Sequence, residues 1–174
     1  MTLEELRIRS AYILHACSGA VQQFSDQLAA TFPNSSLSSQ IMLTQTLKRE
    51  LGMLFRYWAT RQIWILLESD EDIAKQLNIL LLRIFTDAFR LPRDGSGLRY
   101  AQLSTVGEEA QELGKRISYA LEVAHQPLLS ELQRRISSWR DKVIEFTNDA
   151  LKLPTEQLVA KVKEETECAP GSNT

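Results

Sequence analysis

Apolar residues recur three and four positions apart along most of this chain, and this spacing constrains the fold more than any other feature. A helix turns once every 3.6 residues or so, and the spacing therefore gathers apolar side chains on one helical face. The first such seam consists of Leu3, Leu6, Ser10, Ile13, Cys17, Ala20 and Phe24. A second seam consists of Leu43, Leu47, Leu51, Leu54, Trp58 and Ile65, and a third of Leu132, Ile136, Trp139, Val143, Phe146, Ala150 and Leu153. The alternation of apolar and polar residues that is typical of strands persists nowhere. The sequence therefore predicts an all-α fold, a helical bundle of five or six helices.

The predicted helices begin at capping residues and end at proline or short polar side chains. In a capping box, two side chains satisfy each other's free backbone N–H groups. Three helix starts carry this pattern: Thr2 with Glu5, Ser69 with Asp72, and Thr105 with Glu108. The predicted helices cover about 3–30, 39–68, 69–91, 105–124, 132–153 and 155–167. Pro127 predicts a kink or a new start, and LPRDGSGLRYAQLS is the longest predicted flexible segment before the tail.

Composition limits the class of protein. A chain of 174 residues is sufficient for one domain, which we place at 1–154, followed by a short helix and a disordered tail at 155–174. The net charge of −2 argues against a nucleic-acid binder. Two cysteines are too few for a disulfide scaffold, and the apolar runs IWILL and ILLL are too short to span a membrane. We therefore expect a cytoplasmic protein without a membrane span.

Two segments resemble each other within the chain. Residues 50–57 read ELGMLFRY, and residues 112–119 read ELGKRISY. A gapless alignment of 50–92 on 112–154 also matches Leu91-Pro92 with Leu153-Pro154, although its middle pairs apolar with charged residues. If the similarity reflects a duplication, the bundle consists of two related helical hairpins preceded by an N-terminal helix. The alternative is that amphipathic helices share leucines and end in similar ways.

The two histidines limit the possible catalytic and metal sites. Glu122 and His125 have the E-x-x-H spacing of ferritin-like carboxylate proteins, but such a site needs a second copy of this motif. His15 has small neighbours, including Gly19, and in this it resembles phosphotransfer domains. In those domains a lysine that binds the phosphate typically follows the histidine, and no such lysine follows His15. No phosphate-binding loop or zinc motif is present, and the sequence predicts no metal and no cofactor.

Two regions carry residues suited to binding. Arg56, Tyr57, Arg61 and Trp64 combine the aromatic and arginine side chains that are enriched at protein interfaces, and they form the predicted partner-binding site. The second region is the glycine-containing loop near residue 95, where successive backbone N–H groups can form an anion-binding nest. Its candidate anion ligands are Arg90, Arg93 and Arg99.

The leading hypothesis from the sequence is a non-catalytic helical module for protein–protein interaction, a scaffold or adaptor that binds a protein partner or forms a homodimer. The alternative is a phosphotransfer protein or other small enzyme that uses His15 or His125. Replacement of both histidines separates the two hypotheses, because only the enzyme depends on an imidazole.

Overall fold

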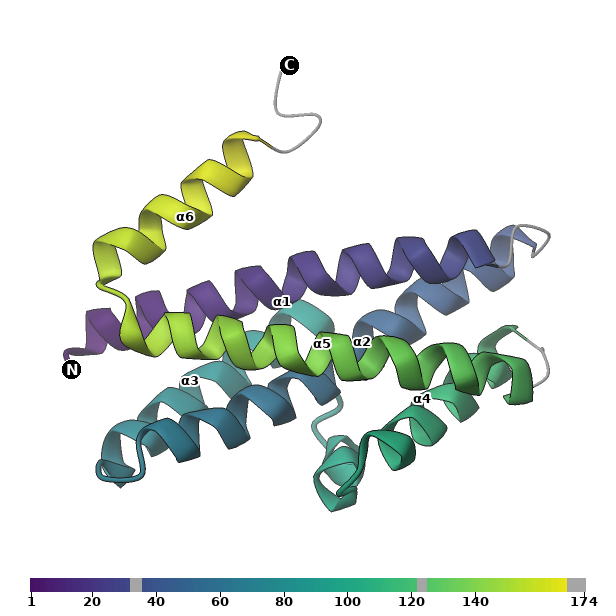
Figure 1. Cartoon of the computed structure of the whole chain (residues 1–174), viewed down its shortest axis with the longest axis horizontal. Coiled ribbons are helices and arrows are strands. Elements are labelled where there is room, and N and C mark those ends of the chain that lie inside the picture. The colour runs from purple at the N-terminus through teal and green to yellow at the C-terminus, as the bar shows by residue number, and fades with distance from the viewer. Residues whose placement is uncertain (32–35, 122–124, 169–174) are drawn as a thin grey trace.

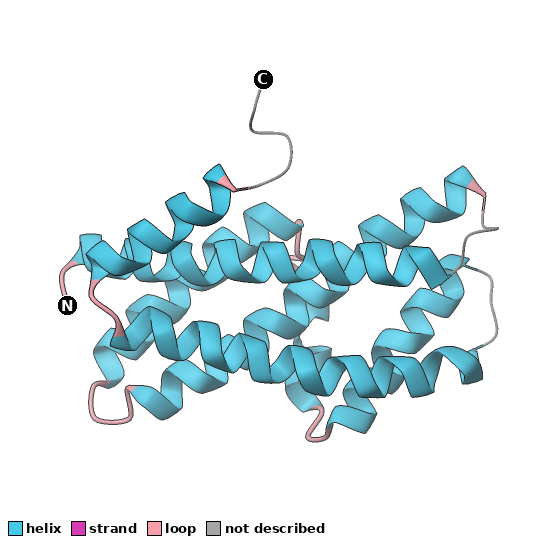
Figure 2. Cartoon of the chain, turned by 45° about the horizontal axis from the view of Figure 1, so that its top comes forward, coloured by secondary structure: helices cyan, strands magenta, loops and turns pink. Residues whose placement is uncertain are grey.

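The computed structural model describes residues 1–31, 36–121 and 125–168, and it confirms the all-α prediction (Figure 1). Within these ranges there are helices and connecting loops and no strand (Figure 2). Over the same residues, no helix combines the length and apolar character that a membrane crossing requires. The elements are α1 (Leu3–Thr31), α2 (Leu37–Leu66), α3 (Glu71–Phe89), the 3₁₀ helix η1 (Ser96–Gln102), α4 (Val106–Leu121), α5 (His125–Lys152) and α6 (Thr155–Glu167).

Helix α2 is the central element of the bundle. It contacts α1, α3, α4, α5 and η1, while α3 and α4 lie toward opposite ends of the molecule (Figure 1). The predicted seam residues Leu47, Leu51 and Leu54 are fully buried, as is most of the first seam on α1. A helix with apolar residues on more than one face must bury each face against a neighbour, and the surrounding helices provide those neighbours.

Helices α2 and α3 form a hairpin and not one bent rod, and α4 and α5 pack together as a second pair. The gapless alignment of 50–92 on 112–154 does not match their boundaries. It places the turn at 67–70 opposite residues 129–132, which lie inside α5. The two pairs therefore differ in helix length and are not gapless copies of one hairpin.

Two of the three predicted capping boxes are present as expected. The N–H of Thr2 donates to Glu5 Oε2 over 2.6 Å, and Glu108 accepts from the N–H of Thr105 over 3.3 Å. The prediction for α3 was wrong by one residue, because Asp70 caps this helix by accepting from the N–H of Ile73. The N–H of Asp70 bonds back to Leu67 in the turn, so the helix starts after Asp70.

The prediction of a flexible segment after α3 was also wrong. Residues 96–102 form η1, which begins after Gly95 in the left-handed conformation, with φ of 81°. Tyr100 is fully buried, and its hydroxyl donates to Glu50 Oε2 over 2.9 Å. A buried tyrosine whose hydroxyl has a hydrogen-bond partner anchors this segment to α2. The glycines and polar residues of the segment did not indicate this anchor.

Helices α1, α5 and α6 are linked by polar contacts between distant parts of the chain. Arg9 Nη1 on α1 donates to the carbonyls of Ala150 and Leu153, over 2.6 and 2.9 Å, at the end of α5. Helix α6, which the sequence analysis placed outside the bundle domain, packs against α1. Leu158 is its fully buried residue. Further along α6, Lys161 donates to Asp149 of α5 over 3.2 Å, and Glu165 lies 2.9 Å from His15 of α1.

Candidate functional site

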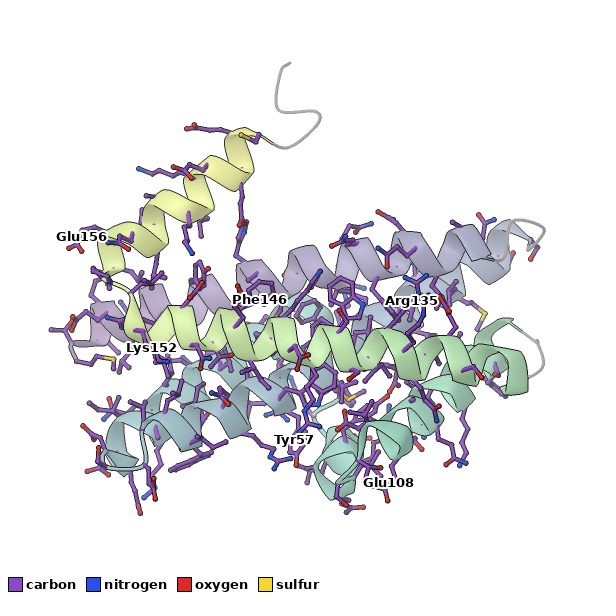
Figure 3. All side chains as sticks on the ribbon, viewed as in Figure 1. Tyr57, Glu108, Arg135, Phe146, Lys152 and Glu156 are labelled. Atoms are coloured by element: carbon purple, nitrogen blue, oxygen red, sulfur yellow. The ribbon has the colours of Figure 1, made fainter. Side chains whose placement is uncertain are left out.

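Three of the predicted partner-binding residues form an exposed ridge on the C-terminal half of α2. Tyr57 is half-buried, and its hydroxyl lies 3.4 Å from the carbonyl of Ala101. The guanidinium of Arg61 lies 5.8 Å from the centre of the Tyr57 ring, a cation–π distance. Trp64 is 38% exposed. Figure 3 shows Tyr57 on the side of the molecule away from α6.

Two residues that the sequence analysis did not assign to the site extend this ridge. Ile65 was predicted on the same buried side of α2 as Trp58, but it is 63% exposed. It is exposed because α4 begins beside Trp58 and runs toward the N-terminal half of α2 (Figure 1). Glu68 lies in the turn after α2, two residues beyond Leu66, and is exposed. We refer to Tyr57, Arg61, Trp64, Ile65 and Glu68 as the α2 ridge.

The α2 ridge carries two charged side chains of opposite sign, Arg61 and Glu68. Within the described ranges, no ion pair forms to Arg61 or to Glu68. Trp64 lies between them in sequence, three residues after the arginine and four before the glutamate. The ridge therefore has an apolar centre with a positive charge on one side and a negative charge on the other.

Trp58 lies next to this ridge but points into the core. Its indole N–H donates to Glu109 Oε2 over 2.8 Å, and both side chains are buried. Burial raises the pKa of the Glu109 carboxyl, although the bond from Trp58 and the charges of Arg140 and Arg61 act in the opposite direction. Trp58 thus serves the packing of α2 against α4, as the seam pattern predicted.

Arg56 does not lie on the ridge with the other predicted partner-binding residues. It faces a groove of about 360 Å³ between α3 and η1, where it meets Arg93 of the predicted anion-binding loop. Burial lowers the pKa of Arg56, and no hydrogen bond or ion pair joins it to another described residue. Arg93 has an exposed contact of 3.9 Å with Asp87. The structure therefore combines one residue from each predicted site.

Arg99 turns away from that groove toward two carboxylates. It bonds to the fully buried Glu50, and its Nε lies 3.6 Å from Glu112 Oε1. Burial raises the pKa of Tyr100 well above its ordinary value, and the adjacent Glu50 charge acts in the same direction. Two carboxylates balance the charge of Arg99, which therefore supports η1 on α2 and α4 and does not face the groove.

Arg90, the third arginine of the predicted anion site, occupies yet another position. It follows α3 as its C-cap in the left-handed conformation, with φ of 53°. Its side chain lines a cavity with Lys48 and Arg49 of α2. The structure thus does not bring Arg90, Arg93 and Arg99 together. Lys48 and Arg49 are consecutive in sequence, but only the fold of the α2–α3 hairpin places them beside Arg90.

His15 lies in a cleft of about 420 Å³ between α1, α5 and α6. Its Nε2 is 2.9 Å from Glu165 Oε2. Lys142 and Phe146 of α5 line the same cleft, and Phe146 is labelled in Figure 3. Lys142 could supply the lysine that is missing from the sequence next to His15. However, its Nζ lies 4.5 Å from the centre of the Trp139 ring, a cation–π contact. Sequence reasoning missed Lys142 because it follows His15 by more than a hundred residues.

The remaining candidates do not form a catalytic or metal-binding cluster. Glu122 and the His125 side chain lie outside the described parts of the structure. Where the structure describes the chain, it brings no three His, Cys, Asp or Glu residues together in a metal-binding arrangement. Cys17 is fully buried, and burial raises its thiol pKa, so that the thiolate is disfavoured. Cys17 thus acts as a small apolar residue of the α1 seam.

No family model, no curated protein and no solved structure matches this chain.

Proposed function

We propose that this chain is a non-catalytic helical module for protein–protein interaction that self-associates through the α2 ridge. The observation that carries the proposal is the arrangement of Arg61, Trp64 and Glu68. An interface between two identical copies with twofold symmetry brings each surface patch against itself. If the axis passes near Trp64, Arg61 of one copy faces Glu68 of the other, and the two indoles meet at the centre.

The exposed apolar residues support the same proposal. Trp64 and Ile65 are adjacent on α2, and a contact between two ridges removes both from water. Tryptophan at the centre of an interface, with charged residues at its rim, is the arrangement in which binding energy concentrates. Arg61 and Glu68 then gain the ion-pair partners that they lack within the described chain.

A charge exchange tests this arrangement. We expect native mass spectrometry and light scattering to detect a dimer at about 100 µM chain, the range of a weak homodimer. Arg61→Glu should weaken the dimer, because like charges then face each other, and Arg61→Glu combined with Glu68→Arg should restore it. Arg83→Glu is the matched control, because Arg83 is an exposed arginine on α3 and outside the ridge. A monomer at this concentration, or a double variant no better than the single one, would overturn the self-association.

The alternative function is phosphotransfer or other chemistry at His15 or His125. The specific observation in its favour is Lys142 in the cleft of His15, and the contact of His15 Nε2 with Glu165 weighs against it. The His15→Gln/His125→Gln double variant distinguishes the two functions. We expect it to dimerise like the wild type. If the double variant still dimerises but no longer supports the protein's function in cells, the enzyme hypothesis is favoured. If the double variant supports that function like the wild type, the enzyme hypothesis is excluded.

A further inference from the structure

The cavity that Arg90 lines with Lys48 and Arg49, which is separate from the α2 ridge, has an excess of positive charge. It has a volume of about 440 Å³ and lies between the N-terminal half of α2 and the end of α3. The lining consists of Thr44, Gln45, Lys48, Arg49, Phe89 and Arg90. Three of these residues are cations and none is an acid. All three cations are exposed at the mouth of the cavity, and together they produce a positive potential that attracts an anion.

The rest of the described chain does little to balance these charges. Neither Lys48 nor Arg90 forms an ion pair within the described ranges. Arg49 Nε lies 3.8 Å from Glu50 Oε1, but Glu50 is also bonded to Arg99 and Tyr100. The end of α3 contributes a partial charge of about −0.5. Three unit charges exceed that value, and the cavity therefore stays positive.

The backbone of Arg90 indicates that its side chain has a use. Among the described residues, Arg90 is the one non-glycine residue with a positive φ. Glycine is the usual residue at this position after a helix, because a Cβ disfavours the left-handed conformation. Hydrogen bonds from the N–H groups of Arg90 and Leu91 to the carbonyl of Thr86 hold the turn. A side chain at a position where glycine is more stable points to a function of that side chain.

We propose that this cavity binds a compact anion that carries phosphate groups, held by Lys48, Arg49 and Arg90. Arginine presents a planar set of donors that matches phosphate oxygens in pairs, and lysine adds a point charge. Gln45 supplies a neutral amide, whereas the Thr44 hydroxyl already donates to the carbonyl of Gln40.

The lining also indicates which part of a ligand is recognised. Phe89 is the only aromatic residue in it, and it is almost fully buried beneath the cavity. No aromatic face is therefore offered on which a base can stack, and the ligand is recognised through its phosphates. The inference does not depend on the proposed self-association, because the cavity involves a different part of α2.

Calorimetric titration of the full chain with sodium pyrophosphate at low salt tests the proposal. We expect saturable binding that Lys48→Gln and Arg90→Gly each weaken by about tenfold, the effect of losing one charged hydrogen bond. The Arg90→Gly variant should also melt at a higher temperature than the wild type, which separates loss of binding from loss of folding. Arg83→Ala is the control, since Arg83 lies on α3 but outside the cavity.

The proposal would be overturned by the absence of saturable binding, by a tenfold loss of affinity in the Arg83→Ala control, or by unchanged affinity in Arg90→Gly. A titration with sodium sulfate at matched ionic strength tests the preference for phosphate. Equal affinity for sulfate and pyrophosphate would also overturn the assignment, because the cavity would then not distinguish a single compact oxyanion from linked phosphates.

Discussion

Gly52 is a residue at which the absence of a side chain decides the packing of two helices. A Cβ at this position would lie 2.7 Å from carbon atoms of Phe89, closer than real Cβ atoms approach their neighbours. Gly52→Ala therefore forces α2 and α3 apart or displaces the Phe89 ring. We expect a loss of about 2 kcal/mol in the free energy of unfolding, as for other overpacked cores, measured by urea denaturation.

Gly19 provides the matched control on α1. A Cβ at Gly19 would meet nothing within 4 Å, and alanine is the better helix former. Gly19→Ala should therefore raise the free energy of unfolding by about 0.5 to 1 kcal/mol. A similar change in both variants would show that helix propensity, and not the contact with Phe89, determines the effect at Gly52.

Glu109 makes stability depend on pH. Because burial raises its pKa in the folded state, the folded chain holds this proton to a higher pH than the unfolded chain. The contribution of Glu109 to stability is therefore fully present below the unfolded pKa, near its ordinary value of 4.5. It falls as the pH rises through the folded pKa.

The Glu109→Gln variant tests this dependence, since its amide oxygen can still accept from Trp58. We expect it to be more stable than the wild type at pH 7, with a difference that shrinks as the pH falls through the folded pKa toward 4.5. Urea denaturation between pH 4 and 7 measures the difference. A constant difference over this range would mean that the charge of Glu109 does not cause it.

At the scale of the helices, Arg9 of α1 donates hydrogen bonds to carbonyls at the C-terminal end of α5. The last carbonyls of a helix lack partners within it, and a cation near them also interacts favourably with the helix dipole. Arg9→Met removes the two bonds to Ala150 and Leu153 while it keeps most of the apolar stem. We expect a loss of about 2 kcal/mol in the free energy of unfolding, the usual scale for a charged hydrogen bond.

The neighbouring Arg7 serves as the control for Arg9. Its side chain is 63% exposed, with a contact to Glu4 at the 4.0 Å limit of an ion pair. Arg7→Met should change the free energy of unfolding by no more than about 0.5 kcal/mol. Hydrogen exchange of the final turn of α5 should speed up in Arg9→Met and not in Arg7→Met. Equal exchange in the two variants would contradict the capping role.

For the molecule as a whole, the fold class followed from the sequence because helical periodicity is a local signal. The seams on α1, α2 and α5 are buried largely as the spacing predicted. Which of Ser69 and Asp70 caps α3 was less predictable, since serine and aspartate are both good N-cap residues. The burial of Tyr100 was not predictable, because its partner Glu50 lies on another element and no local pattern connects them.

The candidate sites were predictable in residue type but not in grouping. Aromatic and arginine residues near the end of α2 indicated a binding surface, and three of them do share the exposed ridge. Arg56 separates from Tyr57 because consecutive residues point about 100° apart around a helix. The separation of Arg90 and Arg99 depends on the left-handed turn and on the buried Glu50, both of which are tertiary features.

The contact of Arg9 with the end of α5 has a consequence for the timing of synthesis. The carbonyls that this arginine binds belong to residues 141 and 144 positions later in the chain. At the usual pace of translation, the ribosome needs on the order of ten seconds to add that many residues. Until then α1 has no α5 to pair with, and its apolar seam stays partly open to chaperones or to other nascent chains. Helix α1 can thus pack early against α2 and α3, but it reaches α5 and α6 only after most of the chain has been made.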